Sequence, residues 1–116
     1  MREEALIDKQ RALGEMGGDL EIYDEVAAAY LEETPRLLQE LSADIANGDA
    51  TSLERHAHSL KSTSRTVGAM LLGSHAEKLE FGARRANLEN PASMLAEIQR
   101  VYQHVQAQLT QQDAGN

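Results

Sequence analysis

The sequence predicts an all-α fold: an antiparallel four-helix bundle with a short additional N-terminal helix. The composition favours helices, because the 116 residues are 41% hydrophobic but include one Phe, no Trp and two Pro. This suits a core of Leu, Ala and Val better than an aromatic-rich β-sheet. Apolar residues also recur at strides of three and four along four long segments, the spacing of one helix face. The short connections between these segments are typical of neighbouring helices in a bundle.

A single domain is expected over residues 1–116, because the chain is long enough for one core and too short for two ordinary domains. The bundle core should span about residues 19–110. A short helix over about residues 4–13 is predicted to open the chain, and glycines then break the helical pattern. These glycines are Gly14, Gly17 and Gly18.

The first long helix is predicted to begin after Asp19, a natural N-cap, and to end near Asn47 and Gly48. Pro35 lies inside it and removes one backbone hydrogen bond. Because the apolar stripe continues in phase across Pro35, we expect a kinked rather than an interrupted helix. The stripe consists of Tyr23, Ala27, Tyr30, Thr34, Leu38, Leu41 and Ile45.

The second long helix has two candidate N-caps, Asp49 and Thr51, of which Thr51 forms a capping-box pattern with Glu54. It should run to about Val67, where Gly68 interrupts it. Its stripe of apolar or small residues consists of Leu53, Ala57, Leu60, Ser64 and Val67.

Two further helices complete the predicted bundle. The third long helix follows almost immediately, with a stripe formed by Ala69, Leu72, Ala76, Leu79 and Ala83. Asn90 and Pro91 then break the chain, and the last helix is expected to end before a polar tail over residues 111–116. Its stripe consists of Leu95, Ile98, Tyr102, Val105 and Leu109.

The charge and composition exclude several classes of function. A net charge of −8 opposes binding to nucleic acid, and the absence of cysteine removes disulfides and thiol catalysis. No apolar run approaches the ~20 residues of a membrane span. The acidic start, residues 1–4, lacks the features of a signal peptide. We therefore expect a cytoplasmic protein that binds neither nucleic acid nor membrane.

The basic residues are concentrated in one window of the chain. Residues 55–85 contain six Lys or Arg against two Glu, a local balance of +4, which leaves −12 for the rest of the chain. This window contains His58. The basic residues therefore suit an anion next to that histidine, although chance clustering is the alternative.

His58 is predicted to face outward on the second long helix. At ~100° per residue it points away from the apolar stripe, whereas Lys61, Ser62 and Arg65 project within about 60° of it. An ordinary imidazole has a pKa of ~6.5 and is mostly unprotonated and nucleophilic near neutral pH. It can accept a phosphoryl group, whose charge Lys61 at i+3 and Arg65 at i+7 would partly neutralise. A solvated surface histidine remains the alternative on geometry alone.

The order of motifs around His58 resembles that of histidine-containing phosphotransfer (HPt) domains. The resemblance covers most of the chain. It is carried by His-Ser-Leu-Lys-Ser-Thr-Ser from His58, Val-Gly-Ala from Val67, Leu79-Glu80, Gly17-Gly18-Asp19 and Asn47-Gly48-Asp49. It implies that His58 is phosphorylated, that Lys61 supports the phosphoryl group and that Gly68 is the glycine that closes the motif.

Ser62 departs from the family pattern, which usually has glycine at this position. A serine there either narrows the space beside the ring or donates a hydroxyl. We expect it to tune the transfer rate rather than abolish transfer.

The resemblance also implies a phosphoryl carrier in a multistep phosphorelay, rather than an enzyme. The carrier would pass the group between aspartates of receiver domains, and the partner would be the receiver domain of a response regulator or of a hybrid histidine kinase. The receiver would supply the aspartate and the magnesium, and the carrier, a monomer without a cofactor, would supply the nucleophile and a docking face around it. Arg84 and Arg85 would lie beyond the centre of that face and be solvated. Both a free-standing protein and a segment of a larger sensor kinase fit the sequence.

Two other classes compete with this interpretation. A helical adaptor would bind a partner without using His58 chemically. A metal protein would draw on His56, His58, His75 and His104, but no metal site is predicted. His56 and His58 face nearly opposite sides of a helix, and the other two lack the spacing of known metal motifs. His56 projects nearer the stripe and is expected to be a partly buried packing residue. No nucleophile, base and oxyanion site of a hydrolase are evident.

Overall fold

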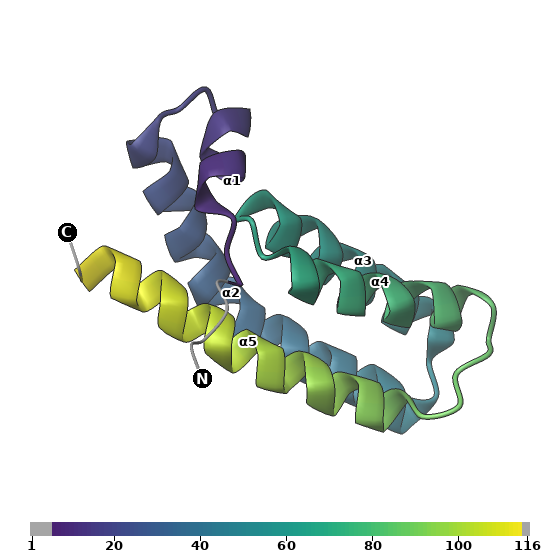
Figure 1. Cartoon of the computed structure of the whole chain (residues 1–116). Coiled ribbons are helices and arrows are strands. Elements are labelled where there is room, and N and C mark those ends of the chain that lie inside the picture. The colour runs from purple at the N-terminus through teal and green to yellow at the C-terminus, as the bar shows by residue number, and fades with distance from the viewer. Residues whose placement is uncertain (1–5, 115–116) are drawn as a thin grey trace.

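The computed structural model describes residues 6–114, with side chains up to residue 110, and this part of the chain is helical without any strand. Its helices are α1 (Lys9–Glu15), α2 (Leu20–Asn47), α3 (Ala50–Thr66), α4 (Met70–Arg84) and α5 (Pro91–Ala114) (Figure 1). The predicted all-α class is confirmed. None of these helices is long and apolar enough to cross a membrane.

The long helices pack side by side around one core. α2 packs against α3 and α5, and α4 packs against the same two helices. The most extensive contact joins α3 to α4, whereas α1 lies against α2 near the α3–α4 turn (Figure 1). The predicted stripes supply the core, since their residues are buried apart from Ile45, which is partly buried. Small residues on α3 and α4 allow the close approach of these two helices; Ala57, Ala76 and Ala83 are among them.

The N-terminal helix begins later than predicted. Residues 6–8 are not helical, and the predicted start at residues 4–5 lies outside the described residues. The Asp8 carboxylate caps α1 by accepting a hydrogen bond from Arg11 N at 3.1 Å, so the helix begins after it. Asp8 N is in turn bonded to Gly68 O at 2.9 Å, which anchors the entry of α1 to the α3–α4 turn. Residues 6–8 therefore lead into this contact with the turn rather than into a helix.

The second helix agrees with its prediction at both ends. Asp19 caps α2 through Ile22 N, and the helix ends at Asn47 with Gly48 as its C-cap, which has a left-handed backbone with φ of 65°. The helix also continues through Pro35, as predicted. The kink at Pro35 stays a prediction.

The start and end of α3 are set by two residues with specialised backbone roles. Asp49 is the N-cap and accepts a hydrogen bond from Ser52 N, whereas Thr51 lies within the first turn, so the Thr51 capping box is wrong. Gly68 follows the C-terminal cap with φ of 92°. A Cβ atom at Gly68 would lie 2.5 Å from Asp8 O, so both its backbone conformation and its closeness to the N-terminal segment require glycine.

The last helix is longer than predicted. It runs to Ala114, through most of the segment expected to be a polar tail, and residues 115–116 lie outside the described part. The reason is local: Gln, Asp and Ala are compatible with a helix, and the sequence has no Gly or Pro between Pro91 and Gly115. Polarity was therefore a poor indicator of where α5 ends.

Candidate functional site

His58 lies on the outer face of α3, as its helical phase predicts. The stripe residues of α3 are buried, with 3% exposure or less, whereas the His58 side chain is 60% exposed. Hydrogen bonds between α2 and α3 hold this phase. Tyr30 Oη lies 2.8 Å from Ser64 Oγ, and the Tyr23 hydroxyl donates to Val67 O at 2.8 Å. The same contacts that bury one face of α3 therefore fix His58 on the other.

A buried carboxylate of α4, that of Glu80, joins the charged groups around His58. Glu80 is only 1% exposed. Its Oε2 lies 2.9 Å from His58 Nδ1 and 3.0 Å from Arg84 Nη2, and its Oε1 lies 2.7 Å from Lys61 Nζ. The close packing of α3 on α4 places these partners together. The site therefore consists of a histidine and two permanently charged cations, Lys61 and Arg84, arranged around one buried anion.

The Glu80 carboxyl is ionised near neutral pH. Burial by itself raises the pKa of Glu80, but the hydrogen bonds and charges of Lys61 and His58 together outweigh burial and hold this pKa below its ordinary value. An ionised carboxylate can only accept hydrogen bonds. The proton between the two groups is therefore assigned to His58 Nδ1, which leaves the lone pair of a neutral ring on Nε2.

The residues expected to support a phosphoryl group lie in one shallow pocket. The pocket has a volume of about 300 Å³, and its lining consists of Glu15, His58, Lys61, Ser62, Arg65 and Thr66. Ser62 is exposed there at i+4 from His58. Glu15 comes from α1, so a carboxylate that the sequence reasoning did not consider also reaches this surface.

Among the described residues, neither Arg65 nor Gly68 forms a hydrogen bond or ion pair with His58, whereas Glu80 does. Arg65 turns toward α4, where its Nη2 lies 3.2 Å from Glu77 Oε1. A Cβ atom at Gly73 would lie 2.8 Å from Arg65 Cγ, so the absence of a side chain at Gly73 lets Arg65 cross α4. Gly68 is buried in the α3–α4 turn and is not among the pocket-lining residues.

Glu80 and Arg84 are the site residues whose roles the sequence reasoning missed. Arg84 was expected to be solvated, and its side chain is 54% exposed, but it is also paired: besides its contact with Glu80, its Nε donates to Glu54 Oε2 at 2.7 Å. Arg85 is exposed and forms no ion pair among the side chains that the structure describes. The signal for Glu80 was its place four residues after Ala76 on the inner face of a helix, where a charged residue needs a partner.

The other histidines lie outside this site. His56 is partly buried as predicted, but it is held by polar contacts rather than by packing alone. Its Nδ1 lies 2.6 Å from Asp44 Oδ2, and its Nε2 lies 3.7 Å from Glu40 Oε1. Within residues 6–110 no group of three or more His, Cys, Asp or Glu side chains is arranged to hold a metal ion.

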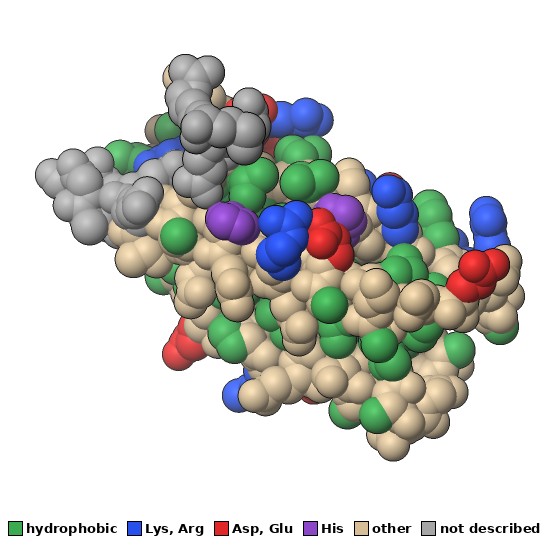
Figure 2. Space-filling view, turned by 60° about the horizontal axis from the view of Figure 1, so that its bottom comes forward, with side chains coloured by type: hydrophobic (Ala, Val, Ile, Leu, Met, Phe, Trp, Pro, Cys, Tyr) green, Lys and Arg blue, Asp and Glu red, His purple; other side chains and the backbone are tan. Residues whose placement is uncertain are grey.

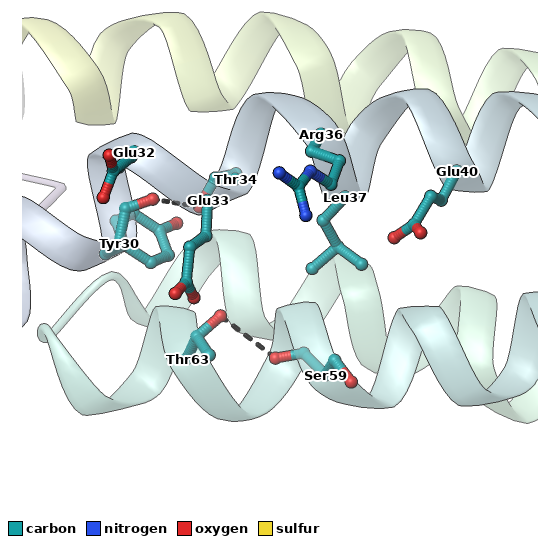
Figure 3. A pocket seen from close by; sticks show the side chains of 9 residues that line it. All are labelled: Tyr30, Glu32, Glu33, Thr34, Arg36, Leu37, Glu40, Ser59 and Thr63. Atoms are coloured by element: carbon teal, nitrogen blue, oxygen red, sulfur yellow. Dashed lines mark hydrogen bonds between the residues drawn. The ribbon is translucent and has the colours of Figure 1, made fainter.

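A larger groove between α2 and α3 does not include His58. Its volume is about 620 Å³, and Figure 3 shows its lining of Tyr30, Glu32, Glu33, Thr34, Arg36, Leu37, Glu40, Ser59 and Thr63. The hydrogen bonds drawn as dashed lines in Figure 3 each lie within a single helix; one of them joins Thr63 Oγ1 to Ser59 O at 3.0 Å. On the face of the molecule in Figure 2, a basic and an acidic side chain stand next to each other between two histidines, and most of the surface around them is uncharged. His58, Lys61 and Ser62 line the smaller pocket instead.

Comparison with known proteins gives two matches. A family model described as "Hpt domain" matches residues 25–109, a range that includes His58, Lys61, Glu80 and Arg84. The fold is similar to that in the crystal structure of histidine-containing phosphotransfer protein B (HptB) from Pseudomonas aeruginosa PAO1. The TM-score is 0.89 at 24% sequence identity, over 98% of this chain and 99% of that chain. No curated protein sequence matches the chain.

Proposed function

We propose that this chain, which belongs to the HPt domain family and serves histidine phosphotransfer in a phosphorelay, carries the phosphoryl group on Nε2 of His58. The observation that carries this assignment is the contact of 2.9 Å between His58 Nδ1 and the buried Glu80 carboxylate. It assigns the ring proton to Nδ1 and leaves Nε2 as the nucleophile on an exposed side chain. His58 is thus oriented by one nitrogen and reactive at the other.

The proposed transfer needs no separate base. The Nε2 lone pair forms the N–P bond, and the electron pair of the P–O bond leaves with the carboxylate of an aspartyl phosphate. The Nδ1 proton stays in place, so the phosphorylated ring carries a positive charge next to Glu80. That carboxylate stabilises the charge at short range, and the reverse step returns the phosphoryl group to an aspartate with the same atom balance.

Lys61 and Ser62 are assigned roles beside the transferred group. The Lys61 ammonium lies one helical turn from His58 and can approach a phosphoryl group that adds about two negative charges. Ser62 lines the same pocket and adjusts the space beside the ring. Arg65 contributes charge from the pocket wall while it stays paired with Glu77. Gly68 is proposed to act indirectly, because it provides the left-handed backbone conformation that the α3–α4 turn needs.

The chain is proposed to be a carrier whose partner supplies the remaining chemistry. The aspartate and the magnesium belong to the receiver domain of a response regulator or of a hybrid histidine kinase, and the group passes between aspartates of such domains. Docking would cover α3 and α4 around His58. Phe81 of α4 supports this, because it is 38% exposed and its ring centroid lies 5.8 Å from Lys61 Nζ.

The domain assignment forms part of the same proposal. We assign residues 1–116 to one domain, with α2 to α5 as an antiparallel four-helix bundle over about residues 19–110 and α1 as the additional helix. The packing of each long helix on two others supports this architecture. A monomeric state, which the family resemblance implies, and a cytoplasmic location, which rests on the composition and charge of the sequence, complete the proposal.

Incubation with a phosphorylated receiver domain tests the carrier function. The wild-type chain should acquire a phosphate that is labile in acid and stable in alkali, because a P–N bond behaves in this way. The His58→Gln variant, which should remain folded because His58 is exposed, should acquire none. Absence of label on the wild type, or equal labelling of the variant, would favour the adaptor interpretation and overturn the proposal.

A further inference from the structure

Glu80 has more cationic partners than one carboxylate needs in the unphosphorylated protein. Lys61 Nζ at 2.7 Å already matches its single charge, and Arg84 Nη2 lies 3.0 Å from its other oxygen. The charged or titratable groups that face Glu80 are His58 and Lys61 from α3 and Arg84 from its own helix. Glu54 of α3 acts on it only through Arg84. The unphosphorylated protein therefore does not by itself explain why Arg84 is paired with Glu80 in addition to Lys61.

A phosphoryl group on His58 changes the demands on Lys61. The group adds about two negative charges in the pocket that Lys61 lines. A lysine ammonium is a compact charge on a flexible stem, so a phosphoryl group in this pocket would draw Lys61, whose side chain is 15% exposed, from Glu80 toward its oxygens. Such a movement takes one partner from a carboxylate that is 1% exposed. A buried anion without a cation is strongly unfavourable.

Arg84 is held in place from outside the pocket. Its Nε donates to Glu54 Oε2 at 2.7 Å, and its guanidinium carbon lies 5.3 Å from the centroid of the Phe81 ring. It also stands at i+4 from Glu80 on the same helix. Arg84 is not among the residues that line the pocket with His58. A phosphoryl group that attracts Lys61 therefore leaves the anchors of Arg84 intact.

We propose that Arg84 is the reserve counter-ion of Glu80. When Lys61 turns to the phosphoryl group, Arg84 keeps the buried carboxylate paired, and Glu80 continues to accept the hydrogen bond from Nδ1 of the phosphorylated His58 ring. Arg84 is thus a positioning residue that acts on the histidine through Glu80. The inference rests on the proposed function, because it assigns a role to Arg84 during the phosphorylated stage.

A test without phosphate uses Lys61→Gln to reproduce the departure of Lys61 from Glu80. The readout is the tautomer of the His58 ring, followed by ¹⁵N NMR of the imidazole nitrogens near neutral pH. Lys61→Gln and Arg84→Gln should each retain the Nδ1–H form, because one cation remains on Glu80. The double variant should lose that preference by more than the sum of the single changes. A second double variant, Lys61→Gln with Arg84→Lys, should keep the preference for the Nδ1–H form, because a cation then remains next to Glu80.

A second test measures the phosphorylated protein. Arg84→Gln should lengthen the lifetime of phosphorylated His58 by about threefold to tenfold, because the ring loses the support of an ionised Glu80 for its Nδ1 proton, and the protonated ring is the better leaving group in cleavage of the P–N bond. Arg85→Gln is the matched control: it removes the neighbouring charge at the same helix end, and Arg85 has no ion pair among the described side chains. In a Glu80→Gln background, Arg84→Gln should have no further effect.

Three outcomes would overturn the inference. They are additive single and double variants in the NMR experiment, equal lifetimes for Arg84→Gln and Arg85→Gln, and an Arg84 effect that persists in the Glu80→Gln background. Circular dichroism establishes that each variant is folded, and the Lys rescue separates lost charge from lost packing. If NMR shows the coupling but a charged receiver never labels the wild-type His58, the proposed function fails while the pairing of Arg84 with Glu80 stands.

Discussion

Two histidines that stand two residues apart on α3 are held in opposite ways. His56 faces α2, where its nitrogens lie 2.6 Å from Asp44 and 3.7 Å from Glu40, and its side chain is 21% exposed. His58 faces α4, has a carboxylate on Nδ1 and is 60% exposed. Both rings contact an acidic partner, but only His58 combines a carboxylate on one nitrogen with an open side chain. The acidic partner alone therefore does not identify a reactive histidine.

The burial of the acidic partner also differs between the two pairs. The Asp44 side chain is 11% exposed beside a ring that is itself largely covered, so that pair joins two helices. The Glu80 side chain is 2% exposed beneath an exposed ring. At His58 the protein covers the anion and presents the base. This arrangement suits a group that must be oriented from below and reached from outside.

The largest expected effect concerns the anion beneath His58. Glu80→Gln should lower the free energy of unfolding near neutral pH by about 1–3 kcal/mol, because charged hydrogen bonds to a buried carboxylate are lost. The folded pKa of Glu80 lies below its ordinary value. Its contribution is therefore complete above the ordinary carboxyl pKa and is lost as the pH falls through the folded value. Urea unfolding of both proteins across this acidic range measures the difference.

The stability gap between wild type and Glu80→Gln should narrow on acidification. A gap that stays constant from neutral pH to acid would show that Glu80 is not stabilised as an anion. In that case the assignment of the proton to His58 Nδ1, and with it the contrast between the two histidines, would not hold.

A medium effect should separate the two histidines directly. His56→Gln should lower the free energy of unfolding by about 1 kcal/mol, because it removes polar contacts between α2 and α3, and it should leave acid-labile labelling intact. His58→Gln should abolish the labelling, and because it removes a hydrogen bond to the buried Glu80 it should also lower the free energy of unfolding by about 0.5–1.5 kcal/mol. Chemical denaturation and labelling by a phosphorylated receiver give the two readouts. Loss of labelling in folded His56→Gln would break the contrast.

The smallest expected effect concerns the space beside His58. Ser62→Gly should speed phosphoryl transfer by less than about tenfold, a barrier change below about 1.4 kcal/mol, because the serine side chain narrows the pocket that it shares with the ring. Rapid-quench kinetics with a phosphorylated receiver domain measures the rate of phosphoryl transfer. Unchanged kinetics would remove any role for Ser62, and slower transfer would indicate that its hydroxyl donates to the group.

The sequence predicted what depends on helical phase and missed what depends on contacts between helices. Strides of three and four placed His58 outside the core and Lys61 on the same side, and the structure agrees. The position of Arg84 depends on Glu54, which lies 30 residues away on another helix, so no local pattern reveals it. Residues 6–8 were wrongly expected to be helical for the same reason, since Asp8 is bonded to Gly68, which lies far along the chain.

The hydrogen bond between Asp8 N and Gly68 O has a consequence for the transfer site. It fixes one end of α1 on the α3–α4 hairpin, and the other end of that helix carries Glu15 into the pocket of His58 and Lys61. On the proposed function, an arriving phosphoryl group meets an attracting ammonium and a repelling carboxylate within the same small volume. Attraction alone would bind the phosphoryl group too tightly for onward transfer, whereas the opposed charges weaken its binding to this site. Through the contact at Gly68, the turn at the end of the hairpin thus helps to favour transfer of the phosphoryl group over its retention on His58.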